Sequence, residues 1–106
     1  MFTPDIVVTH SNADSHQDHR AVNSLARAAF RGTCILQFFI YVSGETTSFK
    51  PSLFIKLDQS MVDLKDAAIA CHSSQAVRLD GHRRHHRESE FGAQAGLARA
   101  EAFEVV

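Results

Sequence analysis

The chain has 106 residues, 44% of them hydrophobic, a size and composition that fit a single domain with a packed core. Charged residues make up 22% and the formal net charge is -1, so no overall charge draws the protein to nucleic acid or to an anionic membrane. No apolar run approaches the roughly 20 residues that a membrane span needs.

Strands and helices are expected to alternate along the chain, which predicts an α/β fold. The β-branched run at residues 5–9 predicts a short buried strand, followed by a helix over about residues 17–31. Residues 35–42 are rich in aromatic and β-branched side chains and predict a second strand. We expect the first helix to be buried through an apolar face made of Val22, Leu25, Ala26, Ala29 and Phe30.

The second half of the chain predicts a strand at residues 53–57 and a helix that begins at Ser60. Ser60 and Asp63 have the spacing of a capping box. A last helix is expected over residues 85–99, and a terminal strand over residues 102–106. The apolar stripe expected to bury the middle helix consists of Met61, Leu64, Ala68 and Cys71.

The start of the chain and its two cysteines indicate a reducing compartment. Residues 1–5 lack the basic and apolar regions of a signal peptide. Cys34 and Cys71 are far apart and match neither a disulfide framework nor a zinc-knuckle spacing. We therefore expect a cytoplasmic protein.

The polar segment at residues 14–20 is the strongest candidate for a functional site, because ligands gather at the carboxyl ends of strands in α/β sheets. His16 and His19 lie three residues apart, so the first helical turn places both imidazoles on one side, and imidazole is a good zinc ligand. Asp18 could accept the other ring N–H of a histidine, and Asp14 could do the same or cap the helix. The ordinary alternative is that all four residues are helix-capping material.

Three separated motifs occur in order along the chain. The first is Pro4 to Ser11 followed by Asp14-x-His16-x-Asp18-His19-Arg20; the second is Lys65 with His72-Ser73-Ser74-Gln75; the third is Phe91-Gly92 with Ala100-Glu101-Ala102-Phe103. Together they resemble the PIG-L/LmbE-like family of N-acetylglucosamine de-N-acetylases over nearly the whole chain.

The resemblance implies a Rossmann-like fold, bound Zn²⁺ and hydrolysis of an N-acetyl amide on an amino sugar or a related small glycoside. It implies that His19 is a zinc ligand and that His16 stabilises the tetrahedral intermediate and protonates the leaving amine. Asp18 would orient His16 and tune its charge. Gln17 stands where the family most often has Pro, a mild departure that leaves the ligand atoms unchanged.

The family's amino-terminal His-Pro-Asp-Asp motif, which supplies further zinc ligands and the general base, does not occur in the sequence. We therefore expect residues 1–106 to form one partial deacetylase domain, the carboxy-terminal half of the fold. We expect it to be inactive alone, because catalytic zinc normally has about three protein ligands. Self-association, or pairing with the missing half, would cover the strand edges that such a division exposes. The alternative is a non-catalytic remnant or association module of the same fold.

Several other residues are candidates for the rim of the pocket. His10 follows the first strand, and the resemblance places His72 and Gln75 near the active site, although helix-end packing explains these two equally well. The basic run at residues 81–87 could contact phosphates, or it could be a solvated loop and helix start. Glu88 and Glu90 follow it directly and no aromatic residues are interleaved, so we expect no nucleic-acid partner.

Overall fold

The computed structural model describes residues 2–72 and 81–106, and this part of the chain has an α/β fold, as the sequence predicts. Strands and helices do not alternate strictly as expected, because two strands and then two helices follow one another in the middle of the chain. The elements are β1 (Ile6–His10), α1 (Gln17–Ala29), β2 (Cys34–Phe38), β3 (Leu53–Lys56), α2 (Gln59–Ala70), α3 (Gly81–Gln94) and β4 (Ala100–Val105). No helix of the described residues combines the length and the apolar character that crossing a bilayer requires.

The strands form one mixed sheet in the order β1-β2-β4-β3. β1 and β2 are parallel, with Val8 opposite Leu36, and β2 and β4 are antiparallel, with Leu36 opposite Val105. A parallel neighbour requires a crossover connection, and α1 supplies it.

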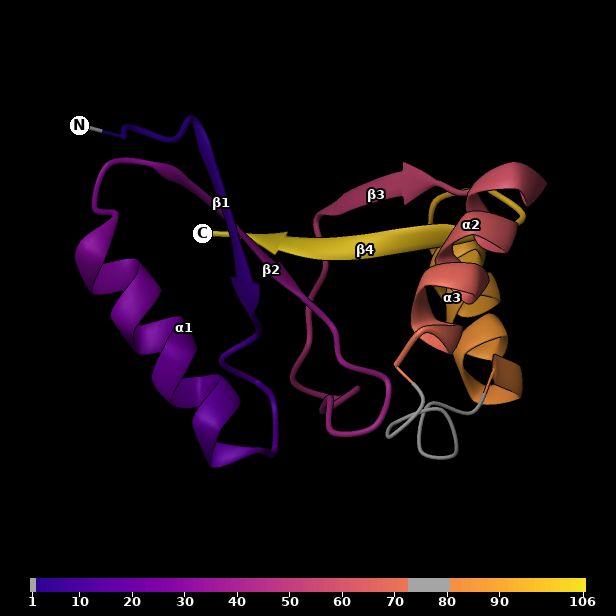
Figure 1. Cartoon of the computed structure of the whole chain (residues 1–106), viewed down its shortest axis with the longest axis horizontal. Helices are drawn as coiled ribbons and strands as arrows, with labels where there is room; N and C mark the ends of the chain where they lie inside the picture. The colour runs from indigo at the N-terminus through magenta and orange to yellow at the C-terminus, as the bar shows by residue number, and fades with distance from the viewer. Residues whose placement is uncertain (1, 73–80) are drawn as a thin grey trace. The chain divides into compact units, whose positions relative to one another are not determined.

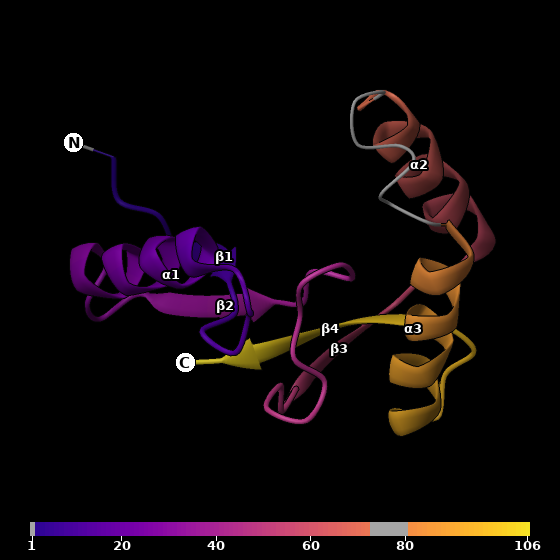
Figure 2. The same ribbon diagram turned by 90° about the horizontal axis from the view of Figure 1, so that it is seen from below.

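The chain divides into two compact units. The first consists of Met1–Leu53 and Ala102–Val106, and the second of Phe54–Glu101. In the first unit α1 lies beside β1 and β2, as both views show (Figure 1, Figure 2). The second unit contains α2 and α3, which are joined by an ion pair of 2.7 Å between Lys65 Nζ and Glu88 Oε2.

Each unit has a small apolar core. Phe39 and Phe49 are buried in the first unit, where their ring centroids lie 5.2 Å apart. Val62 of α2 and Phe91 of α3 are buried in the second. Gly92 of α3 fits there because a Cβ at this position would lie 2.7 Å from the carbonyl oxygen of Leu97, too close for any side chain.

The expected buried face of α1 is largely wrong. Val22 is 44% exposed and Leu25 is 69% exposed, whereas the one buried residue of the helix is Asn23. The Asn23 side-chain amide donates to the His10 carbonyl oxygen at 2.8 Å and to Gln37 Oε1. Because the sheet presents a polar side chain to α1 at this point, a hydrogen-bonding residue of the helix is buried against it.

The expected start and apolar stripe of α2 also differ from the structure. Asp58 caps the helix by accepting the Met61 N–H at 3.0 Å, so the helix begins before Ser60 and does not use the predicted capping box. Met61 is 47% exposed and Leu64 is 74% exposed, whereas Val62 is 2% exposed. α2 thus contacts α3 through ion pairs and buries Val62 instead of the expected stripe.

One face of the sheet in the first unit is apolar and open. Residues directly opposite each other in a sheet share a face. The registers therefore place Ile6, Val8, Leu36 and Val105 together. The exposed fractions of three of these side chains are 56% for Ile6, 55% for Val8 and 50% for Val105, whereas α1 packs on the opposite face through Asn23 and Gln37.

Candidate functional site

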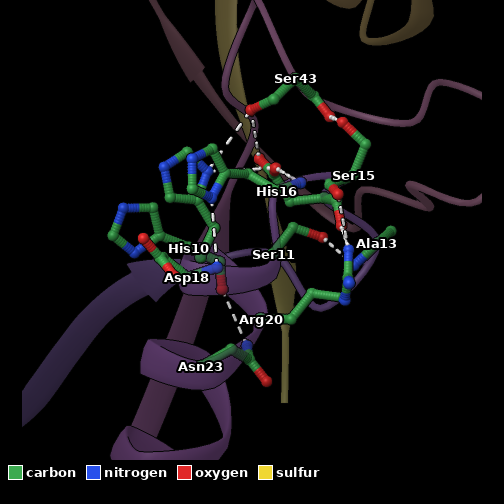
Figure 3. Close-up of polar contacts among 11 residues, drawn as sticks. His10, Ser11, Ala13, Ser15, His16, Asp18, Arg20, Asn23 and Ser43 are labelled. Atoms are coloured by element: carbon green, nitrogen blue, oxygen red, sulfur yellow. Dashed lines mark hydrogen bonds and ion pairs between the residues drawn. The ribbon is translucent and has the colours of Figure 1, made fainter.

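The site is built on the segment that leads from β1 into α1. His16 is the N-cap of α1: its backbone is extended (φ -80°, ψ 122°), and its Nδ1 accepts the backbone N–H of Asp18 at 3.1 Å. Figure 3 shows the side chains of His10, His16 and Ser43 gathered around this segment. An exposed histidine therefore begins the helix, a role that Ser, Thr, Asp or Asn usually fills.

Asp14 is the centre of the site. Its side chain is 0% exposed, and Oδ1 accepts the His16 backbone N–H at 2.8 Å while lying 3.1 Å from His19 Nδ1. Oδ2 accepts the Ser43 hydroxyl at 3.0 Å. Burial alone would raise the pKa of Asp14, but the hydrogen bonds from His16, Ser43 and His19 outweigh it and lower this pKa below 3.8. The carboxylate is therefore ionised at neutral pH.

The contact with Asp14 fixes the orientation of His19. A ring N–H at Nδ1 directed at the carboxylate leaves Nε2 as the nitrogen with a free lone pair. A carboxylate behind a histidine is the usual arrangement around metal-binding imidazoles. Asp14 therefore has both of the contacts expected for it: it pairs with His19, and it accepts a backbone N–H at the start of the helix.

Three imidazoles stack beside Asp14. The ring centroids of His10 and His19 lie 4.4 Å apart with an interplanar angle of 17°, and those of His16 and His19 lie 4.5 Å apart at 19°. Imidazole lone pairs lie in the ring plane, so rings that are stacked and nearly parallel do not direct their lone pairs at one common ion. In this arrangement the stack offers a metal one ligand, not two or three.

His10 is held in its neutral form. Burial, and then electrostatic repulsion from the neighbouring His19 ring, lowers the pKa of His10 below 6.5, and the opposing effect of Asp14 is smaller. Its Nδ1 is buried and makes no hydrogen bond with any of the described residues. His10 therefore contributes a polar but uncharged wall to the site.

A complete zinc site does not fit the described residues. Over residues 2–72 and 81–106, no group of three or more His, Cys, Asp or Glu side chains could hold a metal ion. The donor chemistry around His19 fits a single zinc ligand with its supporting carboxylate. Any catalytic metal at this position would need ligands from outside these residues.

Ser43 is a site residue that the sequence analysis missed. Its carbonyl oxygen accepts the Ser15 backbone N–H at 2.9 Å, and its hydroxyl binds Asp14. Gly44 makes the approach feasible, because a Cβ there would lie 2.6 Å from the Ile40 carbonyl oxygen and overlap the Phe39 ring. The Ser-Gly dipeptide is a turn signal, but nothing in its spacing connects it to Asp14.

The remaining predicted residues lie elsewhere or act differently. The resemblance implies that the Asp18 side chain orients His16. In the structure the backbone N–H of Asp18, not its side chain, contacts the His16 ring. His72 is exposed at the end of α2, in the second unit. Gln75 lies outside the described residues.

The basic stretch forms the first half of α3 and is largely paired with acidic residues. Arg84 is buried and forms an ion pair with Asp66 of α2, a carboxylate that also lies 3.0 Å from His85 Nε2. His86 and Arg87 pair with Glu90 on the same helix. The expected solvated loop is therefore wrong for Arg84, whose charge is neutralised inside the second unit.

Comparison with protein-family models, with curated protein sequences and with solved structures finds no match to this chain.

Proposed function

We propose that the chain carries part of a zinc-dependent N-deacetylase site that acts on an amino-sugar amide, and that it is inactive until further metal ligands are supplied. The three motifs that resemble the PIG-L/LmbE-like family, with their Rossmann-like fold, support this proposal. The observation that carries it is the buried Asp14 carboxylate, 3.1 Å from His19 Nδ1 and hydrogen-bonded to Ser43. A fully desolvated carboxylate aimed at one imidazole costs stability unless it is paired, and it prepares that imidazole to bind a cation.

In this proposal each residue has a distinct role. His19 binds the metal through Nε2, and Asp14 holds its ring by Nδ1. His16 accepts the Asp18 N–H at its Nδ1, so its proton is carried by Nε2, where it can be donated to a leaving amine. Zinc, when bound, would polarise the amide carbonyl and activate a water molecule.

The first test is a zinc titration followed by ¹⁵N resonances of the histidine rings, which detects binding even when one protein ligand makes it weak. We expect the His19 Nε2 resonance to move most and the response to disappear in His19→Ala. Asp14→Asn should weaken zinc binding by about 10- to 100-fold, because a supporting carboxylate contributes by that amount. His86→Ala, a change to a 68% exposed histidine on α3, is the matched control and should leave the titration unchanged.

An unchanged titration in His19→Ala would refute the assigned ligand. The second test is acetate release from N-acetylglucosamine by the zinc-loaded chain, which we expect to be undetectable. Measurable zinc-dependent release that is lost in His16→Ala would show that the site is complete and would overturn the proposed requirement for other ligands.

A second candidate function, an association module, is favoured by the open apolar face of the sheet. Ile6, Val8 and Val105 expose half or more of their surface on that face. β1 is also an edge strand, and its unpaired edge can accept another strand. Self-association and a partial enzyme site are compatible, since a partner on this face could belong to the completed enzyme.

A further inference from the structure

A polar pocket lies along α1, lined by residues other than those around Asp14. Its volume is about 450 Å³, within the range of small-molecule sites. Its lining residues are Asn12, Asn23, Ser24, Arg27, Ala28 and Arg31. They include two arginines, two asparagines and one serine, and none of these lining residues is acidic.

Both arginines of the pocket are available for a ligand. Arg27 belongs to the last turn of α1 and Arg31 follows four residues later, just past the helix end. In the described part of the chain neither forms an ion pair. Arg20 on the same helix differs, because its guanidinium already donates to the carbonyl oxygens of Asp14 and Ser15, at 2.9 and 2.7 Å.

The helix dipole explains the position of Arg27 but not its freedom. A cation in the last turn of a helix is favoured by the negative end of the macrodipole. That interaction does not require the five N–H donors of the guanidinium, which can bind an anion. Two such groups close together repel each other unless an anion lies between them.

One wall of the pocket is rigid. Asn23 is 2% exposed, and its amide is fixed by its bonds to the His10 carbonyl oxygen and to Gln37. A wall held by buried hydrogen bonds loses little freedom when a ligand binds, which favours affinity.

We propose that this pocket binds the phosphoryl group of a small organic phosphate, with Arg27 and Arg31 as its principal contacts. Two guanidinium groups offer ten N–H donors, more than the four lone-pair positions of one carboxylate can use, and they suit the three oxygens and double charge of a phosphate. The Asn12 amide and the Ser24 hydroxyl supply further donors at the rim. The pocket volume exceeds that of a bare ion and leaves room for an attached sugar or similar group.

The experiment is a two-dimensional ¹H–¹⁵N NMR titration of the full chain with glucose 6-phosphate, inorganic phosphate and glucose, at low salt and at 0.3 M salt. We expect glucose 6-phosphate to move the amide signals of Ser24, Arg27 and Arg31, and added salt to weaken the effect. Arg27→Gln and Arg31→Gln should each raise the dissociation constant about tenfold, as expected for loss of a charged hydrogen bond. Arg83→Gln removes the same charge from an exposed position on α3 and should change nothing.

The outcomes separate clearly. Tighter binding of glucose 6-phosphate than of inorganic phosphate supports the organic ligand, and equal binding supports phosphoryl recognition with free phosphate as its source. Binding that survives in both pocket variants, or that is lost in Arg83→Gln, overturns the pocket. If the folded wild-type chain binds neither glucose 6-phosphate nor inorganic phosphate, the proposal is overturned as well. Because no arm uses zinc or deacetylation, the proposed enzyme function can fail without affecting this result.

Discussion

Asp14 and His10 show how burial gives neighbouring residues opposite electrostatic characters. Asp14 is completely buried, yet three hydrogen bonds hold it in its charged form. The buried Nδ1 of His10 has no hydrogen-bond partner among residues 2–72 and 81–106, and burial favours the neutral form of its ring. The site thus places His19 between a stabilised anion and an uncharged imidazole.

The lowered pKa of His10 predicts a pH dependence of stability. In the unfolded chain the residue binds a proton near its ordinary pKa of 6.5, and in the folded chain only at lower pH. Between these two values the unfolded state holds more protons, so stability is complete above pH 6.5 and is lost as the pH falls through the folded pKa. Urea unfolding at pH 7.5 and at pH 5 should show this loss.

The matched variants for this prediction are His10→Asn and His86→Asn. His10→Asn should show a smaller loss of stability between the two pH values than the wild type. His86→Asn changes a 68% exposed side chain and should behave like the wild type. An equal loss in the wild type and in His10→Asn would assign the effect to other groups.

At the scale of elements, polar contacts orient the helices more than apolar stripes do. α1 faces the sheet through Asn23, and α2 meets α3 through Lys65 and Glu88. Glu88 is 0% exposed, and Lys65 also pairs with Glu101 at 2.8 Å. A buried ion pair is costly to break on one side, because the other charge stays desolvated.

Glu88→Gln should therefore lower the free energy of unfolding of the second unit by about 2 kcal/mol. This is less than the usual cost of breaking a buried ion pair, because Lys65 retains its ion pair with Glu101. Glu90→Gln on the same helix removes a 42% exposed carboxylate and should cost about 0.5 kcal/mol or less. Denaturant unfolding of both variants checks the difference. Equal effects would mean that the pair between α2 and α3 does not hold the unit together.

At the scale of the whole molecule, the open sheet face and the edge of β1 are the features that an isolated domain usually avoids. Apolar side chains gather there on one side of the first unit, opposite the face that α1 covers. The open face is thus a surface on which a partner, or a second copy, could bury apolar side chains.

We expect the chain to self-associate in a concentration-dependent way, measured by sedimentation velocity, and Val8→Lys to weaken this association. Val8 is already 55% exposed, so the substitution should cost little folding stability. Leu64→Lys places the same charge on a 74% exposed residue of α2 and serves as the control. Association that is unaffected by Val8→Lys, or weakened equally by both, would exclude the sheet face.

The sequence by itself determined the order of the elements, since β-branched runs and helical spacing depend only on near neighbours. It also located the polar segment at residues 14–20, because a strand that ends in polar residues before a helix is a local pattern. The His16 and His19 side chains lie together as their spacing predicts.

Only the tertiary structure decided which faces are buried and which residues complete the site. Ser43 binds Asp14 from a loop 29 positions away. Asn23, and not Leu25, is the buried residue of α1 because the polar side chain of Gln37 in the sheet lies opposite it. Both depend on contacts between distant segments, which periodicity and spacing do not encode. A buried polar group needs a hydrogen-bond partner, and this partner can lie anywhere in the sequence. The partner can therefore be identified only from the folded chain.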